Sequence, residues 1–346
     1  MVGSRAAGCI ARCIALVAAI AVAAGSAQAA DFYAGKTITV VAGTDVGGGF
    51  SIYARAIAKH LPRFIPGTPT VVVKNMPGAG GASASAWLYR IAPKDGTAIA
   101  SVSPNAILGR LLDDSQTQYD PTRFGYLAGA ERGTRLCMTF RHSAVRTLED
   151  ALVRKAVIGA TSAGSPTREY AAMFKHAAGA KFEIVSGYKG PPDLFIAMER
   201  GEIDGVCGLD WSALKSQQPD WLRDKKLNLL LQASLEPEPE LAALGVPTPW
   251  TSIREDVDRQ AVALMVSFQQ AFGKSYMAPP GVPDAQVRIL RDAFNAVLHD
   301  PEFLADAAKL RIDVAPQAGE EIARVVASAY SAQQTVIDRL RTIVEP

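Results

Sequence analysis

The sequence of 346 residues contains few side chains that supply chemistry, with only four histidines and four cysteines. The histidines show no spacing, with one another or with a cysteine, that is typical of metal ligands. They are His60, His142, His176 and His299. The common zinc-site patterns are therefore excluded, and we expect neither a metal nor another cofactor.

The motifs that bind nucleotide phosphates are also missing. Gly47 and Gly49 are followed by Ile52 where a dinucleotide-binding fingerprint would have its third glycine, and no Gly-Lys-Ser/Thr sequence follows. Net charge is small as well, because 36 lysines and arginines face 34 aspartates and glutamates. A chain this close to neutral gives no electrostatic reason to expect nucleic acid or an acidic lipid surface as a partner.

Long hydrophobic runs are confined to residues 1–30. This segment has Arg5 and Arg12 near its start, an apolar stretch over residues 14–24, and Ala27-Gln28-Ala29 before a polar sequence. The pattern is typical of a secretory signal peptide, and we expect cleavage after Ala29 or Ala30. The apolar stretch is shorter than the ~20 residues that span a bilayer, so we expect an exported protein without stable membrane insertion.

Two cysteines, Cys137 and Cys207, lie beyond the predicted leader. In an oxidising compartment these two thiols are a natural pair, and a bridge between them would close a loop of about 70 residues. Two buried free thiols are the alternative.

A glycine-rich turn dominates what the sequence does contain. Residues 37–41 are rich in β-branched side chains and predict a strand, and apolar residues recur at helical spacing from Ile52 onward. Between them lie Gly47, Gly48 and Gly49, which let the backbone approach a ligand closely. The following helix start offers unpaired N–H groups, so an anion could bind there. The alternative is a flexible connection without a ligand.

The same strand, turn and helix order recurs along the chain. Strands are predicted over 70–73, 97–102, 136–140, 156–160 and 182–185. Ser103 and Asn105 follow the strand at 97–102, and Ser162, Gly164, Ser165 and Thr167 follow the strand at 156–160. This order predicts an α/β fold in which ligands gather beyond the carboxyl ends of the strands. Two such sheets would form a cleft.

The last third of the chain is predicted to be mostly helical. The proline-rich segment 236–249 is interpreted as a crossing back to the first half. Residues 283–299 carry Val287, Leu290 and Phe294 on one face of a helix, and residues 320–343 predict one long closing helix.

An exported serine hydrolase is a competing hypothesis, because Ser162 in Ala-Thr-Ser-Ala-Gly lies one glycine short of a nucleophile elbow. Ser165 is a second possible nucleophile. The mechanism also needs an acid and a histidine, and Asp210 precedes only one histidine, His299, in the usual order.

Seven motifs in order resemble the periplasmic solute-binding proteins of tripartite tricarboxylate transporters, also called Bug-type receptors. They are GGGFSIYAR, VVVKNMPGAGG, APKDGT, GATSAGSPT, SGYKGPPD, GEIDG and APPGVPDAQVRILRDAF, and they run over essentially the whole chain after the leader. The resemblance implies a two-domain flytrap fold that holds a small organic carboxylate between its domains. It also implies a periplasmic location, delivery to membrane permease subunits, and no catalysis; we expect a monomer. A sensory binding subunit is a further alternative.

On this resemblance, the first domain would comprise residues 31–130 and 246–346, and the second would comprise residues 131–245. The family grips its ligand mainly with backbone N–H groups at two facing helix starts. The candidate ligand-binding residues are Gly47, Gly48, Gly49, Phe50, Ser51, Ser103, Asn105, Ser162, Gly164, Ser165, Thr167, Tyr188 and Asp210. Ser51 stands where the family usually has aspartate, Tyr188 lies in the Tyr-Lys-Gly motif, and Arg168 replaces a residue that is often histidine. A subgroup of the family has cysteines at the positions of Cys137 and Cys207.

Overall fold

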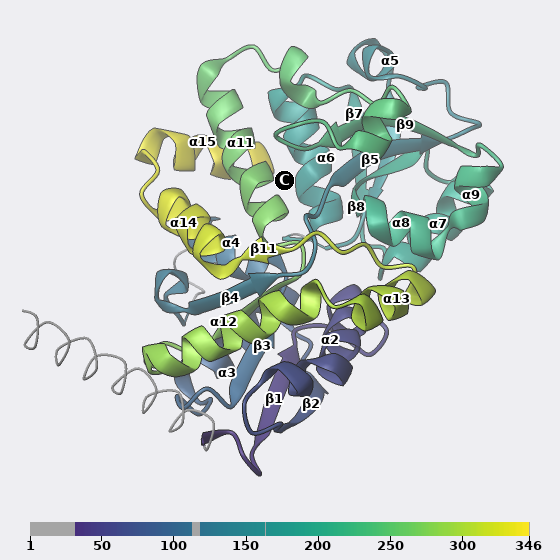
Figure 1. Cartoon of the computed structure of the whole chain (residues 1–346). Coiled ribbons are helices and arrows are strands. Elements are labelled where there is room, and N and C mark those ends of the chain that lie inside the picture. Colours follow the sequence, from purple (N-terminus) through teal and green to yellow (C-terminus); the bar gives the residue numbers. More distant parts are fainter. Residues whose placement is uncertain (1–31, 113–117, 163, 346) are drawn as a thin grey trace, which may run out of the picture.

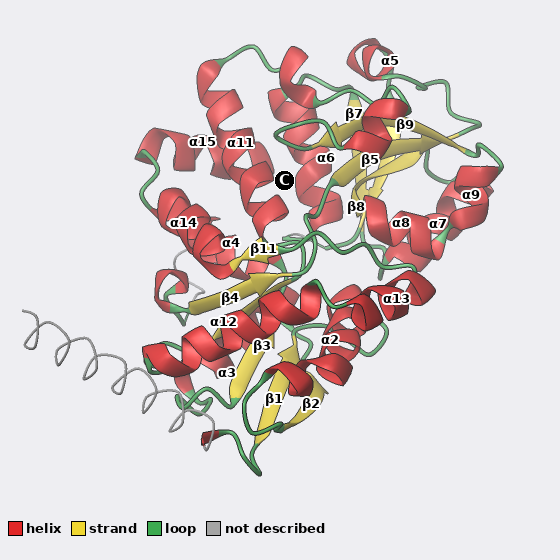
Figure 2. Cartoon of the chain, in the orientation of Figure 1, coloured by secondary structure: helices red, strands yellow, loops and turns green. Residues whose placement is uncertain are grey.

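The strands of this protein form two separate sheets flanked by helices. The computed structural model describes residues 32–112, 118–162 and 164–345. Within these residues one sheet has six strands and the other has five, and helices surround both (Figures 1 and 2). The predicted α/β fold with two sheets is confirmed.

The first sheet has the strand order β11-β4-β10-β3-β1-β2. Strand β1 pairs in parallel with β2 and β3, whereas β10 runs antiparallel between β3 and β4. The strands are β1 (Thr37–Ala42), β2 (Thr70–Asn75), β3 (Ala98–Ser101), β4 (Gly125–Gly129), β10 (Ser275–Ala278) and β11 (Gln317–Ala318). The first three strands therefore end at the same edge, as the sequence predicted.

The second sheet has the order β7-β6-β8-β5-β9. Strand β6 is parallel to β7 and β8, and β5 is antiparallel to β8 and β9. The strands are β5 (Arg135–Phe140), β6 (Ala156–Ala160), β7 (Phe182–Ser186), β8 (Gly205–Asp210) and β9 (Leu227–Ala233). Cys137 faces Cys207 across β5 and β8, and the two residues form a disulfide, in agreement with the sequence prediction.

Helices cover both sheets. Those of the first two thirds are α2 (Gly49–His60), α3 (Ala82–Arg90), α4 (Pro104–Leu112), α5 (Leu148–Val153), α6 (Pro166–Ala177), α7 (Pro191–Arg200), α8 (Trp211–Gln217), α9 (Pro219–Arg223) and α10 (Pro239–Ala243). The last third has α11 (Asp256–Ala271), α12 (Asp284–Leu298), α13 (Pro301–Leu310), α14 (Gly319–Tyr330) and α15 (Gln334–Val344). Short 3₁₀ turns include Leu61–Phe64 and Ala79–Gly81.

Each helix packs on the face that its apolar residues form. In α12 the residues Leu290, Phe294 and Val297 are fully buried against the first sheet, as their spacing predicted. Helix α2 buries Tyr53 and Ile57 in the same cluster. Because apolar burial stabilises by about 25 cal/mol per Å², these faces fix the helices on the sheet and so position the turns that precede them.

One expectation about the last third differs from the structure. Residues 320–343 form two helices, α14 and α15, separated at residues 331–333. The break lets α14 bury Ile322 and Val326 in one core while α15 buries Leu340 and Ile343 in the core of the second sheet. Helix α11 packs on the second core through Val262 and on a core of the first sheet through Phe268, and the chain then pairs with the first sheet at β10.

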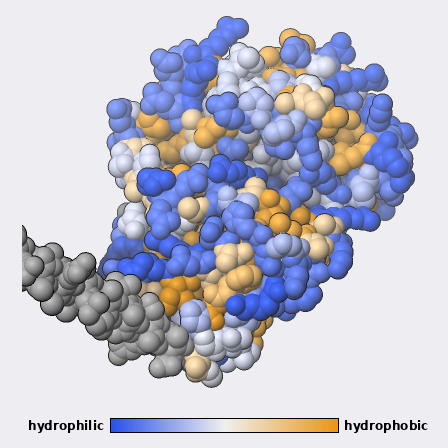
Figure 3. All heavy atoms as spheres, in the orientation of Figure 1, coloured by the Kyte–Doolittle hydropathy of each residue, from blue (hydrophilic) through white to orange (hydrophobic). Residues whose placement is uncertain are grey.

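The strands β4, β9 and β10 escaped the sequence analysis because each is short or lies in a segment without clear alternation. The division into domains at residues 130 and 246 stays a prediction. No helix in the described ranges is long and apolar enough to cross a bilayer. The predicted leader and its cleavage site lie outside the described residues. On the face drawn in Figure 3, hydrophilic residues predominate and apolar residues gather in separate patches.

Candidate functional site

A cavity of about 790 Å³ lies where helix starts from the two halves of the chain meet. Five of the predicted ligand-binding residues line it: Ser103, Asn105, Ser162, Gly164 and Ser165. The other lining residues are Ala79, Gly80, Ala82, Ala106, Gly109, Leu112, Tyr119, Pro166, Glu169, Arg341, Val344 and Glu345. The lining is therefore rich in hydroxyl, amide and backbone groups, with one guanidinium and two carboxyl groups.

On the side of the first sheet, the turns after β1, β2 and β3 converge. A Cβ added at Gly43 would lie 3.2 Å from the Cα of Gly81, and one added at Gly81 would lie 3.3 Å from the backbone nitrogen of Ser103. Gly81 also has a φ of 98°, which favours glycine. Glycine at these two positions therefore lets the backbone bring Ser103 and the start of α4 to the cavity.

On the side of the second sheet, the start of α6 faces the cavity. Its N-cap, Ser165, and its first residue, Pro166, both line the cavity. Thr167 is buried, and its Oγ1 accepts from the N–H of Thr161 at 3.0 Å and pairs with Ser165 Oγ at 3.0 Å. Thr167 thus holds the turn together instead of lining the cavity. Strand β8 passes under this turn at Gly208, where a Cβ would lie 2.1 Å from the Pro166 oxygen.

Asn105 joins the two sides. Its Nδ2, on α4, donates to the Gly164 carbonyl oxygen and to Glu169 Oε2, the latter at 2.8 Å. Burial raises the pKa of the Glu169 carboxyl to about 7, against the opposing effects of the Asn105 hydrogen bond and of Arg168. A buried carboxyl group therefore lies in the first turn of α6, beside the predicted anion position.

The other predicted helix start, that of α2, does not line this cavity. Gly47 and Gly49 are exposed, whereas Phe50 and Ser51 are buried. Ser51 Oγ has no hydrogen-bond partner among the residues that the structure describes. A Cβ added at Gly49 would lie 3.3 Å from Lys274 Cε, so this start rests against a lysine side chain.

Lys274 belongs to a buried group of four charges. Its Nζ pairs with Glu131 Oε2 at 2.6 Å and lies 3.7 Å from Asp210 Oδ2, while Arg135 NH1 lies 3.4 Å from the same oxygen. Burial alone would lower the Lys274 pKa, but the carboxylates of Glu131 and Asp210 raise it. Burial raises the Glu131 pKa, although the positive charge of Lys274 acts to lower it. Lys274 also lies over the Phe50 ring, 5.1 Å from its centroid.

The remaining predicted residues lie away from the cavity. Asp210 is 5% exposed and belongs to the buried charge group, and its Oδ1 has no partner among the described atoms. Tyr188 is half-buried against the core that contains Leu194. Arg168 is buried, and its NH1 donates to the Val344 carbonyl oxygen at 2.9 Å, so it ties α6 to the end of α15.

Three relevant residues escaped the sequence analysis, namely Glu169, Lys274 and Arg341. Glu169 follows the α6 motif by two positions, yet an acid in a first helical turn is usually exposed, so its burial gave no signal. Lys274 and Arg341 lie far along the chain from the motifs that they approach. Only the fold brings them there.

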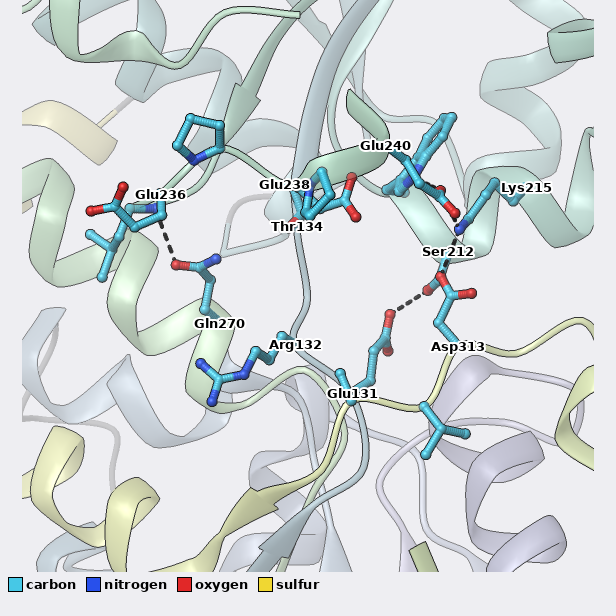
Figure 4. A pocket seen from close by; sticks show the side chains of 16 residues that line it. Glu131, Arg132, Thr134, Ser212, Lys215, Glu236, Glu238, Glu240, Gln270 and Asp313 are labelled. Carbon is cyan, nitrogen blue, oxygen red and sulfur yellow. Dashed lines mark hydrogen bonds and ion pairs between the residues drawn. The ribbon is translucent and has the colours of Figure 1, made fainter. Parts of the chain in front are cut away.

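A second cavity, of about 610 Å³, lies along the connection between β4 and β5 (Figure 4). Its lining has five carboxyl groups and two cationic groups. Ser212 Oγ donates to Glu131 Oε1 within it, and Lys215 Nζ pairs with Glu240 at 2.7 Å and with Asp313 at 3.0 Å. This excess of acid disfavours an anionic ligand.

Within the part of the chain that the structure describes, one group of residues has metal-ligating atoms close together: those of His60, Asp300 and Glu302 lie within 4.8 Å of one another. Arg63 already ion-pairs there, with NH2 2.5 Å from Asp300 Oδ2 and NH1 2.7 Å from Glu302 Oε2. A guanidinium therefore occupies the cation position, and these residues form an ion-pair network between the end of α2 and the start of α13.

The structure gives no support to a serine nucleophile. Ser165 Oγ pairs with a threonine hydroxyl, and no hydrogen bond joins Ser162 or Ser165 to a histidine in residues 32–112, 118–162 and 164–345. His299 bonds instead to the Asn295 carbonyl oxygen at 2.8 Å, and His60 to Asp306 at 3.0 Å.

A search of protein-family models finds no match to this chain. Among curated proteins, the chain is 27% identical over 349 residues to a protein of Cupriavidus necator described as "UPF0065 protein in gbd 5'region". The match covers 94% of both chains. Similarity therefore extends over nearly the whole length.

Solved structures share the fold. A TctC solute-binding protein from Polaromonas has a TM-score of 0.66 and 18% identity, with 88% of this chain and 99% of that one covered. MatC from Rhodopseudomonas palustris, solved with bound malate, has a TM-score of 0.62 and 19% identity, with 90% and 99% covered. The periplasmic binding protein BugD has a TM-score of 0.62 and 20% identity, with 89% and 97% covered. The structural neighbours are thus TctC and Bug-type solute-binding proteins, as the motif order implied.

Proposed function

We propose that this chain, which has the fold and the motif order of the TctC and Bug-type solute-binding proteins, is an exported receptor for a small organic carboxylate. Its solute binds in the cavity between the α4 and α6 starts. The receptor then delivers the solute to membrane permease subunits, works as a monomer in the periplasm, and performs no catalysis.

The observation that carries this proposal is the lining of the 790 Å³ cavity. It combines polar groups from both sheets' turns with the start of α6. Ser103 and Asn105 come from the first sheet's side, and Ser162 and Ser165 come from the second. A site built from both halves is completed only when they come together, as capture by closure requires.

Carboxylate binding follows from this chemistry. The α6 start offers the positive end of the helix dipole and the N–H of Thr167, since Pro166 has no N–H and the N–H groups of Ser165, Arg168 and Glu169 donate to carbonyl oxygens. The serine hydroxyls and the Asn105 amide add side-chain donors. Hydrogen bonds to a charged group contribute roughly 1.5–3 kcal/mol each, so a few of them approach the ~8 kcal/mol of a micromolar complex. The malate bound to the structural neighbour MatC belongs to the same ligand class.

The α2 start is proposed as a second contact. Gly47 and Gly49 are exposed, so their backbone remains accessible to a solute that extends beyond the cavity. The second cavity is a poorer candidate because its carboxyl groups would repel the ligand.

The test is a thermal-shift screen of the protein without residues 1–30 against small mono-, di- and tricarboxylates. The uncharged amides of the same acids are the controls. An acid that stabilises at a hundredfold excess over its dissociation constant adds ~2.7 kcal/mol to the unfolding free energy, and its amide adds none.

Asn105→Ala should remove the shift, because Asn105 lines the cavity from α4 and its Nδ2 joins that side to Gly164 and Glu169 on the α6 side. Asn295→Ala, at an exposed position on α12, is the matched control and should keep it. If neither acids nor amides shift the transition, and denatured protein releases no bound carboxylate on mass spectrometry, the proposal is wrong.

A further inference from the structure

The cavity has an electrostatic problem for an anion. Among the described residues that line it, two have carboxyl groups, Glu169 and Glu345, and only one has a cationic side chain, Arg341. The Arg341 guanidinium is partly engaged, since its Nε donates to the Leu111 carbonyl oxygen at 2.9 Å and its NH1 to Asp338 at 3.1 Å. A solute carboxylate that enters beside an ionised Glu169 would therefore meet like charge.

Glu169 also competes with the solute for a donor. Both acceptors of Asn105 Nδ2, the Gly164 carbonyl oxygen and Glu169 Oε2, belong to the α6 side. An ionised Glu169 offers only acceptors, as the solute does. A protonated Glu169 keeps one oxygen for Asn105 and gains an O–H that can donate to the solute carboxylate, and such charge-assisted bonds are the stronger ones.

We propose that Glu169 is the specificity-determining residue that makes solute capture proton-linked: the receptor binds its anionic carboxylate with Glu169 protonated. This inference rests on the proposed function. Upon binding, one proton from water adds to a Glu169 carboxylate oxygen, and the solute keeps its charge. Above the Glu169 pKa the complex therefore takes up one proton for each solute.

The surroundings of Glu169 agree with a neutral carboxyl group. It is 5% exposed, between Asn105 on α4 and the body of α6. The charged groups around it are Arg168 on its own helix and, lining the same cavity, Arg341 and Glu345 from the end of the chain. Arg168 is committed to the Val344 carbonyl oxygen, and Glu345 is exposed. Burial raises the Glu169 pKa to about 7, so its charge changes near neutral pH.

The experiment measures the dissociation constant of malate, and of the best acid in the screen, at pH 6.5 and pH 8.5. Over this range the protonated fraction of a group with a pKa near 7 falls about twentyfold, so the wild-type affinity should fall by about the same factor. Glu169→Gln supplies a permanent N–H donor without charge. It should bind equally well at both pH values, close to the wild-type affinity at pH 6.5.

Glu149→Gln is the matched control, because Glu149 is an exposed acid in the first turn of α5 and does not line the cavity. It should keep the wild-type pH dependence. Calorimetry of the wild type at pH 8 in buffers with different ionisation enthalpies provides a readout that needs no variant, and it should show uptake of about one proton per solute.

Equal wild-type affinity at both pH values would overturn the inference and leave the proposed receptor function intact. A pH dependence that persists in Glu169→Gln, or that Glu149→Gln also removes, would overturn it as well. If no carboxylate binds at either pH, the proposed function itself fails, and the inference fails with it.

Discussion

The starts of α2 and α6 carry the same sequence signal but lie in opposite electrostatic surroundings. Both follow a strand, both have glycine in the preceding turn, and both have a serine at or near the start of the helix, Ser51 in α2 and Ser165 at the N-cap of α6. The α2 start has no acid in its first turn and rests against Lys274. The α6 start holds the buried Glu169 carboxyl and lines a cavity. Turn composition therefore predicts where an anion could bind, whereas distant residues decide how strongly it binds and at which pH.

Breaking the charge group beside α2 should have the largest effect. Lys274→Met removes the cation that faces Glu131 and Asp210, and both carboxylates are nearly fully buried. A buried ion pair that loses one partner typically costs 3–5 kcal/mol, so we expect about this loss in the free energy of unfolding, measured by urea denaturation.

Lys309→Met is the matched control for Lys274→Met. Lys309 pairs with Asp306 at 3.2 Å on the surface, with its side chain 76% exposed, and its loss should cost less than ~0.5 kcal/mol. Equal costs for the two variants would show that the charges beside α2 are solvated.

The titration of Glu169, in the first turn of α6, should make the free energy of unfolding depend on pH. The Glu169 pKa is near 7 in the folded chain and ordinary in the unfolded one, so the folded state holds the proton more tightly between these values. Stability is then fully present below the unfolded pKa and is lost as pH rises through about 7. The wild type should lose about 2–3 kcal/mol relative to Glu169→Gln between pH 5 and pH 8.

Urea denaturation of both proteins at several pH values measures this difference. The control is Glu149→Gln, whose stability should follow that of the wild type because Glu149 is exposed. Parallel pH profiles for the wild type and Glu169→Gln would mean that Glu169 titrates normally in the folded state.

Lys274 and Glu169 also show the limit of what the sequence could predict. Strand composition and the glycine turns predicted β1, β2, β3 and the turn at Ser162–Thr167, because these signals are local. The approach of Lys274 to Gly49, across more than 200 residues, depends on β10 inserting between β3 and β4. The short β10 has no alternation to reveal it, so no local pattern could place Lys274. The sequence therefore predicted the backbone turns of the candidate site but not its charged side chains.

Paired serine variants compare the two helix starts directly. Ser165 lines the cavity at the α6 start, whereas Ser51 Oγ is buried in α2 without a partner among the described atoms. Loss of a hydroxyl that bonds to a charged solute should lower the affinity of Ser165→Ala about tenfold. Ser51→Ala should keep the affinity within about twofold and leave stability unchanged, since it removes an unsatisfied group. A larger affinity loss in Ser51→Ala, measured by calorimetry with the acid found in the screen, would place the solute at α2 instead.

The smallest expected difference concerns the glycines of the two turns. Gly47 has a φ of 90° and Gly164 a φ of 76°, and apart from the adjacent residues no described atom lies within 4 Å of an added Cβ at either position. Alanine should therefore cost about 1 kcal/mol of stability at each site through backbone strain alone, and this cost makes the two variants a matched pair. In Gly164→Ala, the backbone relieves this strain by rotating the Gly164 carbonyl group, which accepts a hydrogen bond from Asn105. In Gly47→Ala, the backbone that rotates belongs to a turn outside the cavity. We expect a threefold to fivefold loss of affinity for Gly164→Ala and a smaller loss for Gly47→Ala. If Gly47→Ala lost more affinity than Gly164→Ala at equal stability, the α2 start would be the main contact of the solute. Lys274, rather than Glu169, would then be the charged side chain nearest to the solute.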